Sequence, residues 1–132
     1  MILSKEDFAK LASLVDRVDP DTREKIMKLI EMDKVARCKE SFIAFASAMW
    51  PIFISGKHHQ IMAEAFERVA KGELKRLIIN MPPRHTKSEF ASFLLPAWFL
   101  GKFPQKKIIQ ASHTAELAVG FGRKVRNLVQ SE

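Results

Sequence analysis

Residues 75–88 read KRLIINMPPRHTKS, and this stretch decides the fold that the sequence predicts. Its first part, residues 75–80, is a short run rich in apolar and β-branched side chains, which is the pattern of a buried strand. A loop of proline and polar residues follows, and the hydrophobic spacing of a helix begins near Lys87. The stretch therefore predicts a strand that turns through a loop directly into a helix.

The residues downstream predict the same order of elements again. We expect a helix over residues 87–100, a second strand over 107–112, and a last helix from Ser112 or Thr114 to about Gln130. This order implies two parallel strands joined by a right-handed crossover. Because two parallel strands do not make a stable sheet alone, the sequence predicts the front part of a larger α/β domain.

The residues upstream predict only helices. Apolar residues at helical spacing indicate two short helices within residues 1–34, the first capped by Ser4 and the second beginning at Asp19-Pro20-Asp21. This N-terminal helical region could be a lid or a docking element. Two further helices are expected over residues 39–49 and 58–71, before the strand.

Composition narrows the class of protein. Apolar residues make up 47% of the 132, so a core can form. Residues 1–56 hold nine basic and nine acidic residues, whereas residues 57–132 hold thirteen and six, so the net charge of +7 lies in the second part and favours polyanionic partners. One cysteine, Cys38, excludes an internal disulfide and suits a reducing compartment. We expect no secretory leader and no membrane-spanning helix.

The loop has most of what a phosphate-binding loop requires. Such a loop needs a preceding strand, a turn that exposes backbone N–H groups, a lysine, a hydroxyl residue and a helix that starts there. Lys87 and Ser88 stand at the lysine and hydroxyl positions, but Met81 and Thr86 replace both usual glycines. Thr86 must then adopt a conformation that glycine usually supplies. The alternative is an ordinary proline-rich connection that carries a surface lysine.

Residues 81–89, MPPRHTKSE, resemble the deviant phosphate-binding loop of the large subunits of tailed-phage terminases. The resemblance covers roughly residues 35–132 and adds little over residues 1–34. Outside the loop it is carried by His59-Gln60, residues 65–69 and 72–78, Pro96-Ala97-Trp98, Gly101, Pro104, and residues 107–112 and 116–126.

The resemblance implies a partial P-loop NTPase domain of the RecA or helicase-like kind over residues 35–132, with parallel strands. It implies ATP and Mg²⁺ as cofactors, with Lys87 at the β- and γ-phosphates, Ser88 at the metal ion and Arg84 at the γ-phosphate. Arg84 and Lys87 are the catalytic candidates. The whole nucleotide-binding set is Gln60, proposed to read adenine, with Pro82, Pro83, Arg84, His85, Thr86, Lys87 and Ser88.

Proteins of this family are ATP-driven DNA-packaging motors with a separate nuclease domain. The resemblance therefore implies double-stranded DNA, a portal protein and a terminase small subunit as partners, a homo-oligomeric ring, no membrane, and assembly in the host cytoplasm. An ATPase of this type also needs an apolar strand that ends in Asp-Glu, and none follows Lys87. No carboxylate cluster for a two-metal nuclease is present either. We therefore expect weak nucleotide binding with little or no turnover.

The basic residues of the second part allow other functions. They could contact DNA phosphates, or they could form an ordinary solvated face. A non-catalytic DNA-binding or assembly module and a helicase-like ATPase stay open as alternatives. The four histidines lack the spacing of a zinc site. The DNA-contact candidates are Lys102, Lys106, Lys107, Arg123, Lys124 and Arg126.

Overall fold

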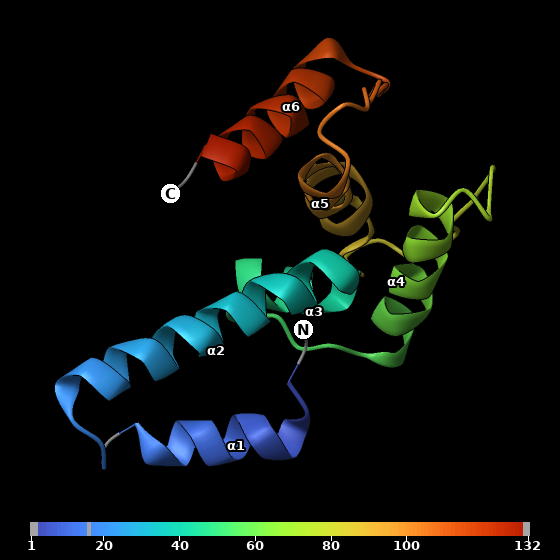
Figure 1. Cartoon of the computed structure of the whole chain (residues 1–132). Helices are drawn as coiled ribbons and strands as arrows, with labels where there is room; N and C mark the ends of the chain where they lie inside the picture. The colour runs from blue at the N-terminus through green and yellow to red at the C-terminus, as the bar shows by residue number, and fades with distance from the viewer. Residues whose placement is uncertain (1–2, 16, 131–132) are drawn as a thin grey trace. The chain divides into compact units, whose positions relative to one another are not determined.

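The computed structural model describes residues 3–15 and 17–130, and all the regular secondary structure in these ranges is helical (Figure 1). The chain divides into two units, Met1–Glu40 (unit 1) and Ser41–Glu132 (unit 2). The elements are α1 (Lys5–Leu14), α2 (Pro20–Glu40), α3 (Phe42–Met49), α4 (Lys57–Ala70), η1 (Glu89–Leu94, a π-helix), α5 (Leu95–Lys102) and α6 (Ala115–Gln130).

The predicted pair of parallel strands is wrong, because no β-strand occurs in the described part of the chain. Residues 75–80 and 107–112 have no regular secondary structure. Two of their isoleucines lie open to solvent, Ile78 at 86% and Ile109 at 96% exposed, whereas Ile79 is half-buried against the core. A strand is held by hydrogen bonds to a neighbour, and a parallel pair also needs helices on both faces. The α/β fold class and the parallel-strand sheet of a P-loop NTPase domain are therefore overturned.

The predicted helices are present, together with several of their caps, but α2 continues to Glu40, beyond the predicted N-terminal region of residues 1–34, and α3 begins at Phe42 rather than at Lys39. The Ser4 hydroxyl accepts a backbone hydrogen bond of 3.1 Å in the first turn of α1, and the Asp19 carboxylate accepts one of 2.9 Å at the start of α2. The Thr114 hydroxyl does the same for α6 at 3.3 Å. Each of these side chains satisfies a backbone donor that the first helical turn leaves without a partner. Among the described helices, none combines the length and apolar character needed to cross a bilayer.

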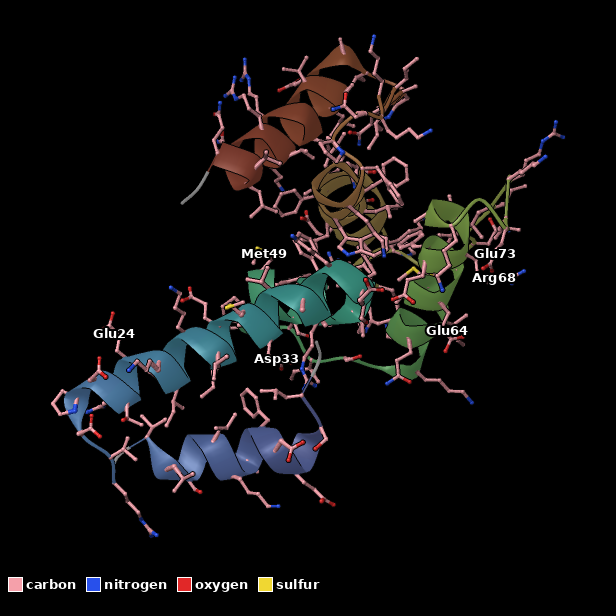
Figure 2. All side chains as sticks on the ribbon, viewed as in Figure 1. Glu24, Asp33, Met49, Glu64, Arg68 and Glu73 are labelled. Atoms are coloured by element: carbon pink, nitrogen blue, oxygen red, sulfur yellow. The ribbon has the colours of Figure 1, made fainter. Side chains whose placement is uncertain are left out.

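In unit 1, a buried carboxylate ties the segment before α1 to α2. Asp33, labelled in Figure 2, is 2% exposed. Its carboxylate accepts hydrogen bonds from the Leu3 backbone N–H and from Arg37 Nε, both at 2.6 Å. Arg37 also donates to the Leu3 carbonyl at 2.6 Å. The Leu3 N–H first, and Arg37 second, lower the pKa of Asp33. This network fixes the start of the chain on the helix it packs against.

We expect Asp33→Asn to remove an acid-sensitive part of the stability of unit 1. A neutral amide cannot accept charge-assisted bonds from both Leu3 and Arg37. Because the pKa of Asp33 is lowered in the folded state, its contribution is complete above about pH 4 and is lost as the pH falls through the lowered value. In urea unfolding followed by far-UV circular dichroism, the free energy of unfolding of the variant should be lower than that of wild type at pH 6 and nearly equal to it at low pH. The exposed Glu24, also on α2, supplies the control Glu24→Gln, which should match wild type at both values. An Asp33→Asn deficit that is independent of pH would contradict the prediction.

The core of unit 2 forms around Phe42, which is completely buried. Its ring meets those of Phe66, Phe90 and Trp98 edge to face, with centroid distances of 5.2, 5.3 and 5.6 Å. One side chain thus joins α3, α4, η1 and α5. A second tie comes from Glu67 on α4, whose carboxylate accepts the Phe42 backbone N–H at 2.8 Å. The other buried members of this cluster are Ala46, Met62, Ala63 and Leu94.

The helical segment predicted over residues 87–100 is present, but its middle is the π-helix η1. Pro96 follows in α5 and has no N–H for the Ser92 carbonyl four residues earlier. The side-chain amide of Gln110 donates to that carbonyl at 3.1 Å. A residue of the segment that was expected to be a strand therefore holds the helix through its side chain.

Candidate functional site

The loop before η1 contains two residues with left-handed backbone conformations. The φ angle is +64° at Arg84 and +57° at Thr86. This region costs a non-glycine residue about 1–2 kcal/mol, and a β-branched residue such as threonine rarely adopts it. The missing glycine predicted this conformation for Thr86, and Thr86 does adopt it.

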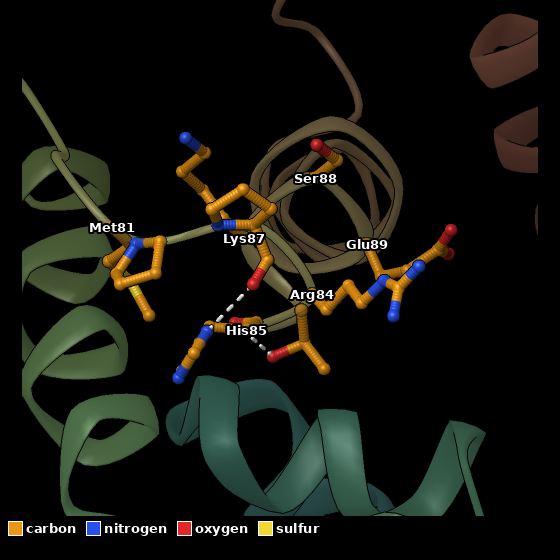
Figure 3. Close-up of a pocket in the computed structure, with 9 residues that line it drawn as sticks. Met81, Arg84, His85, Lys87, Ser88 and Glu89 are labelled. Atoms are coloured by element: carbon orange, nitrogen blue, oxygen red, sulfur yellow. Dashed lines mark hydrogen bonds between the residues drawn. The ribbon is translucent and has the colours of Figure 1, made fainter.

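A helix begins directly after Thr86. Lys87 and Ser88 form its start, and the Phe90 N–H donates to the Thr86 carbonyl at 2.9 Å. The N–H groups of a first turn have no carbonyl of their own helix to bond. A left-handed residue followed by helical residues also turns successive N–H groups toward one side, as in backbone sites for anions. Residues 81–89 line a pocket of about 480 Å³ at this point (Figure 3).

The structure brings most of the predicted nucleotide-binding residues to this pocket. Figure 3 shows the side chains of Lys87 and Ser88 at the helix start and that of Arg84 extending away from them on the side of Glu89. Gln60 does not line the pocket and lies exposed on α4. The predicted residues in the lining are Pro82, Pro83, Arg84, His85, Thr86, Lys87 and Ser88.

His59, which was not predicted as a site residue, contacts the loop from α4. It is 6% exposed, and its ring packs against those of Phe53 and Phe90, with centroid distances of 4.8 and 5.0 Å. Its Nε2 lies 2.6 Å from the Thr86 hydroxyl. A signal for its burial, though not for its contact with the loop, exists in the sequence, because His59 shares the i, i+3, i+4, i+7 face of α4 with the buried residues Met62, Ala63 and Phe66.

Burial is the main cause that lowers the pKa of His59, and the neighbouring His58 and His85 lower it further. The His58 ring centroid lies 3.8 Å from that of His59 and 5.8 Å from that of His85. The His59 ring is therefore neutral at neutral pH, which leaves one ring nitrogen as a donor and the other as an acceptor.

The carboxylate nearest to the loop is already paired. Glu89 accepts a hydrogen bond from the Lys124 ammonium at 2.9 Å, and this ion pair links η1 to α6. The same ammonium lies 5.7 Å from the ring centroids of both Phe93 and Phe121. Lys124, predicted as a DNA contact, thus has a structural partner, and the negative charge of Glu89 beside the pocket is offset.

The other DNA-contact candidates lie on separate elements. Lys102 is half-buried at the end of α5, with its ammonium 5.2 Å from the Trp98 ring centroid. Lys106 and Lys107 are exposed before α6. The remaining two, on α6 itself and also exposed, are Arg123 and Arg126.

Within the described ranges, no group of three or more His, Cys, Asp or Glu residues could hold a metal ion. Ser88 remains the one predicted magnesium ligand, and its hydroxyl lies exposed in the pocket lining. Cys38 is half-buried on α2, and burial raises the pKa of its thiol, which keeps it protonated at neutral pH.

Comparison of the chain with protein families, with curated proteins and with solved structures finds no match. The resemblance to terminase large subunits therefore stays a prediction that rests on residues 81–89 and their flanks.

Proposed function

We propose that this chain binds the phosphate groups of Mg²⁺-ATP at the loop of residues 81–88, as the nucleotide-binding part of a DNA-packaging motor of the terminase type. The observation that carries the proposal is the left-handed Thr86 directly before the helix start at Lys87. A threonine in a conformation that favours glycine carries a cost, and such strain is concentrated at ligand-binding loops. The strand that usually precedes such a loop is absent from the described residues, so the proposal rests on the loop and on the helix that starts after it.

Each part of the loop has a role in this proposal. The first-turn N–H groups hold phosphate oxygens, the Lys87 ammonium reaches the outer phosphates, and the Ser88 hydroxyl ligates the metal ion. Arg84 lines the same pocket and adds a second positive charge. The ion pair between Glu89 and Lys124 offsets part of the repulsion that a carboxylate at this point would exert on phosphate.

Hydrolysis is not expected of this chain by itself. Only Glu89, Glu116 and Glu132 follow Lys87 as carboxylates. Glu89 is engaged with Lys124, and Glu116 lies in the first turn of α6. A motor needs a carboxylate that activates water and another that supports magnesium. We therefore propose binding without appreciable turnover, with double-stranded DNA as the partner of the complete motor.

Titration calorimetry of the chain with Mg²⁺-ATP tests the proposal. We expect saturable binding that Lys87→Ala weakens by about 10- to 150-fold, because a charge-assisted hydrogen bond contributes about 1.5–3 kcal/mol. The control is Lys71→Ala, which removes an equal charge from the exposed end of α4 and should bind as wild type does. ATP binding that is absent, or that is equally tight in Lys87→Ala, would refute the proposal. Salt-dependent binding of duplex DNA by a chain that ignores ATP would favour the DNA-binding module instead.

A further inference from the structure

The His59 imidazole uses both of its ring nitrogens. Its Nδ1 accepts a hydrogen bond from the Gly56 backbone N–H at 2.9 Å, at the start of α4. A nitrogen that accepts carries no proton, so the proton of the neutral ring lies on Nε2. The Nε2–H therefore donates to the Thr86 hydroxyl, 2.6 Å away and 27 residues later in the chain.

The Thr86 hydroxyl is also hydrogen-bonded to the backbone of the loop. While accepting from His59, it donates its own proton to the His85 carbonyl at 2.7 Å. Both bonds restrict the rotation of the Thr86 side chain. The residue they restrict is the one with φ of +57°, at the position where a phosphate-binding loop usually has glycine.

We infer that His59 is a positioning residue that holds Thr86 in the left-handed conformation and so replaces the glycine that this loop lacks. The inference deepens the proposed function, on which it rests for the identity of the ligand. It assigns His59 no contact with ATP. The loop is prepared by a side chain on α4, so that its N–H groups are oriented before a phosphate arrives.

Packing alone does not account for a histidine at this position. A phenylalanine could pack against the Phe53 and Phe90 rings without burying any ring nitrogen, but it would leave the Gly56 N–H without its acceptor. The structure instead buries an imidazole and satisfies both nitrogens with partners from two elements, Gly56 and Thr86. The titratable groups that face the ring are His58 on α4 and His85 in the loop, and both disfavour its protonation. A protonated ring would turn Nδ1 into a donor facing the Gly56 donor, so acid should loosen the connection.

A double-mutant cycle with His59→Phe and Thr86→Gly tests the inference. His59→Phe keeps the aromatic packing and removes both ring nitrogens, the donor to Thr86 and the acceptor of the Gly56 N–H. Thr86→Gly removes the need for the bond to Thr86, because glycine adopts positive φ freely. Two readouts apply to each chain: the affinity for Mg²⁺-ATP, and the rate of trypsin cleavage after Arg84, with cleavage after Arg76 as the internal comparison. Cleavage of a locally opened segment follows the population of its open form.

In the wild-type background we expect His59→Phe to raise cleavage after Arg84 and to weaken ATP binding by about fivefold to tenfold, the effect of one buried hydrogen bond. In the Thr86→Gly background the same change should alter the cleavage rate and the ATP affinity by less than about twofold, because a glycine needs no support at positive φ. If the two residues acted independently, the effect of His59→Phe would be equal in both backgrounds. His58→Phe, one position earlier and exposed, is the matched control and should leave cleavage unchanged. In the wild-type chain, the NMR shift of the Thr86 amide should follow the ionisation of His59.

Equal effects of His59→Phe in both backgrounds would overturn the inference and leave the proposed function standing. Coupling seen in cleavage and NMR, in chains that do not bind ATP, would support the positioning role and remove the proposed function. Should His59→Phe lose helicity, Thr86→Val replaces it, because it deletes the hydroxyl and leaves the packing of His59 intact. Cleavage in Thr86→Val that equals that of wild type would then overturn the inference.

Discussion

Phe42→Ala is expected to lower the free energy of unfolding of unit 2 by about 3–5 kcal/mol, the usual cost of deleting a completely buried phenylalanine ring. The ring lies edge to face with three others that come from α4, η1 and α5, so these neighbours cannot all move into the space that is left. Small domains have only about 5–15 kcal/mol of stability, so the variant should retain little of its folded population.

Both tryptophans, Trp50 and Trp98, belong to unit 2, so their fluorescence in a urea titration follows this unit alone. With a slope of about 1.5 kcal/mol per molar urea, the midpoint should fall by about 2–3 M. Met49→Ala is the control, because Met49 is in the same helix but 44% exposed, and its midpoint should shift by less than about 0.5 M. A Phe42→Ala midpoint within that range would show that α3 is not the centre of the core.

The helices could be predicted from the sequence because their signals are local. Ser4, Asp19 and Thr114 each bond a backbone N–H within their own first turn, and such caps can be read without knowing the rest of the fold. The strands could not be predicted in the same way. A β-branched run such as residues 75–80 shows a side-chain preference, but a strand exists only beside another strand. In the described part of the chain that neighbour is absent, and Ile78 and Ile109 lie exposed.

The candidate site shows the same difference between features with a local signal in the sequence and features that depend on distant contacts. The conformation of Thr86 could be predicted, because a missing glycine in a loop of this pattern has a direct consequence for φ. The role of His59 could not, because it depends on which side of α4 meets a loop 27 residues away. The resemblance selected Gln60, its neighbour in sequence, but Gln60 lies on the exposed side of that helix. Local patterns identify residues that bend the backbone, whereas residues that hold the bend in place require the packed structure.

Phe90→Ala is expected to lower the free energy of unfolding of unit 2 about as much as Phe42→Ala does, and also to change the loop. Phe90 is completely buried, and its ring contacts those of Phe42, Phe53 and His59 with centroid distances of 5.3, 5.2 and 5.0 Å. Its deletion should cost about 3–5 kcal/mol as a core cavity. It should also admit water beside His59, and because burial is the main cause of the lowered pKa of His59, that pKa should rise toward its ordinary value.

Phe90→Leu separates the two effects, because leucine keeps the site apolar and preserves most of its volume. We expect it to cost less than about 1.5 kcal/mol and to leave the pKa of His59 lowered. Tryptophan fluorescence in urea gives the stability of each variant, and NMR titration of the His59 ring protons gives the pKa while the variant is folded. A His59 pKa that stays low in folded Phe90→Ala would contradict the role of burial. The pKa of His59 matters for the loop, because a protonated ring can no longer accept the Gly56 N–H. Thr86 would then lose the hydrogen bond that supports its left-handed conformation.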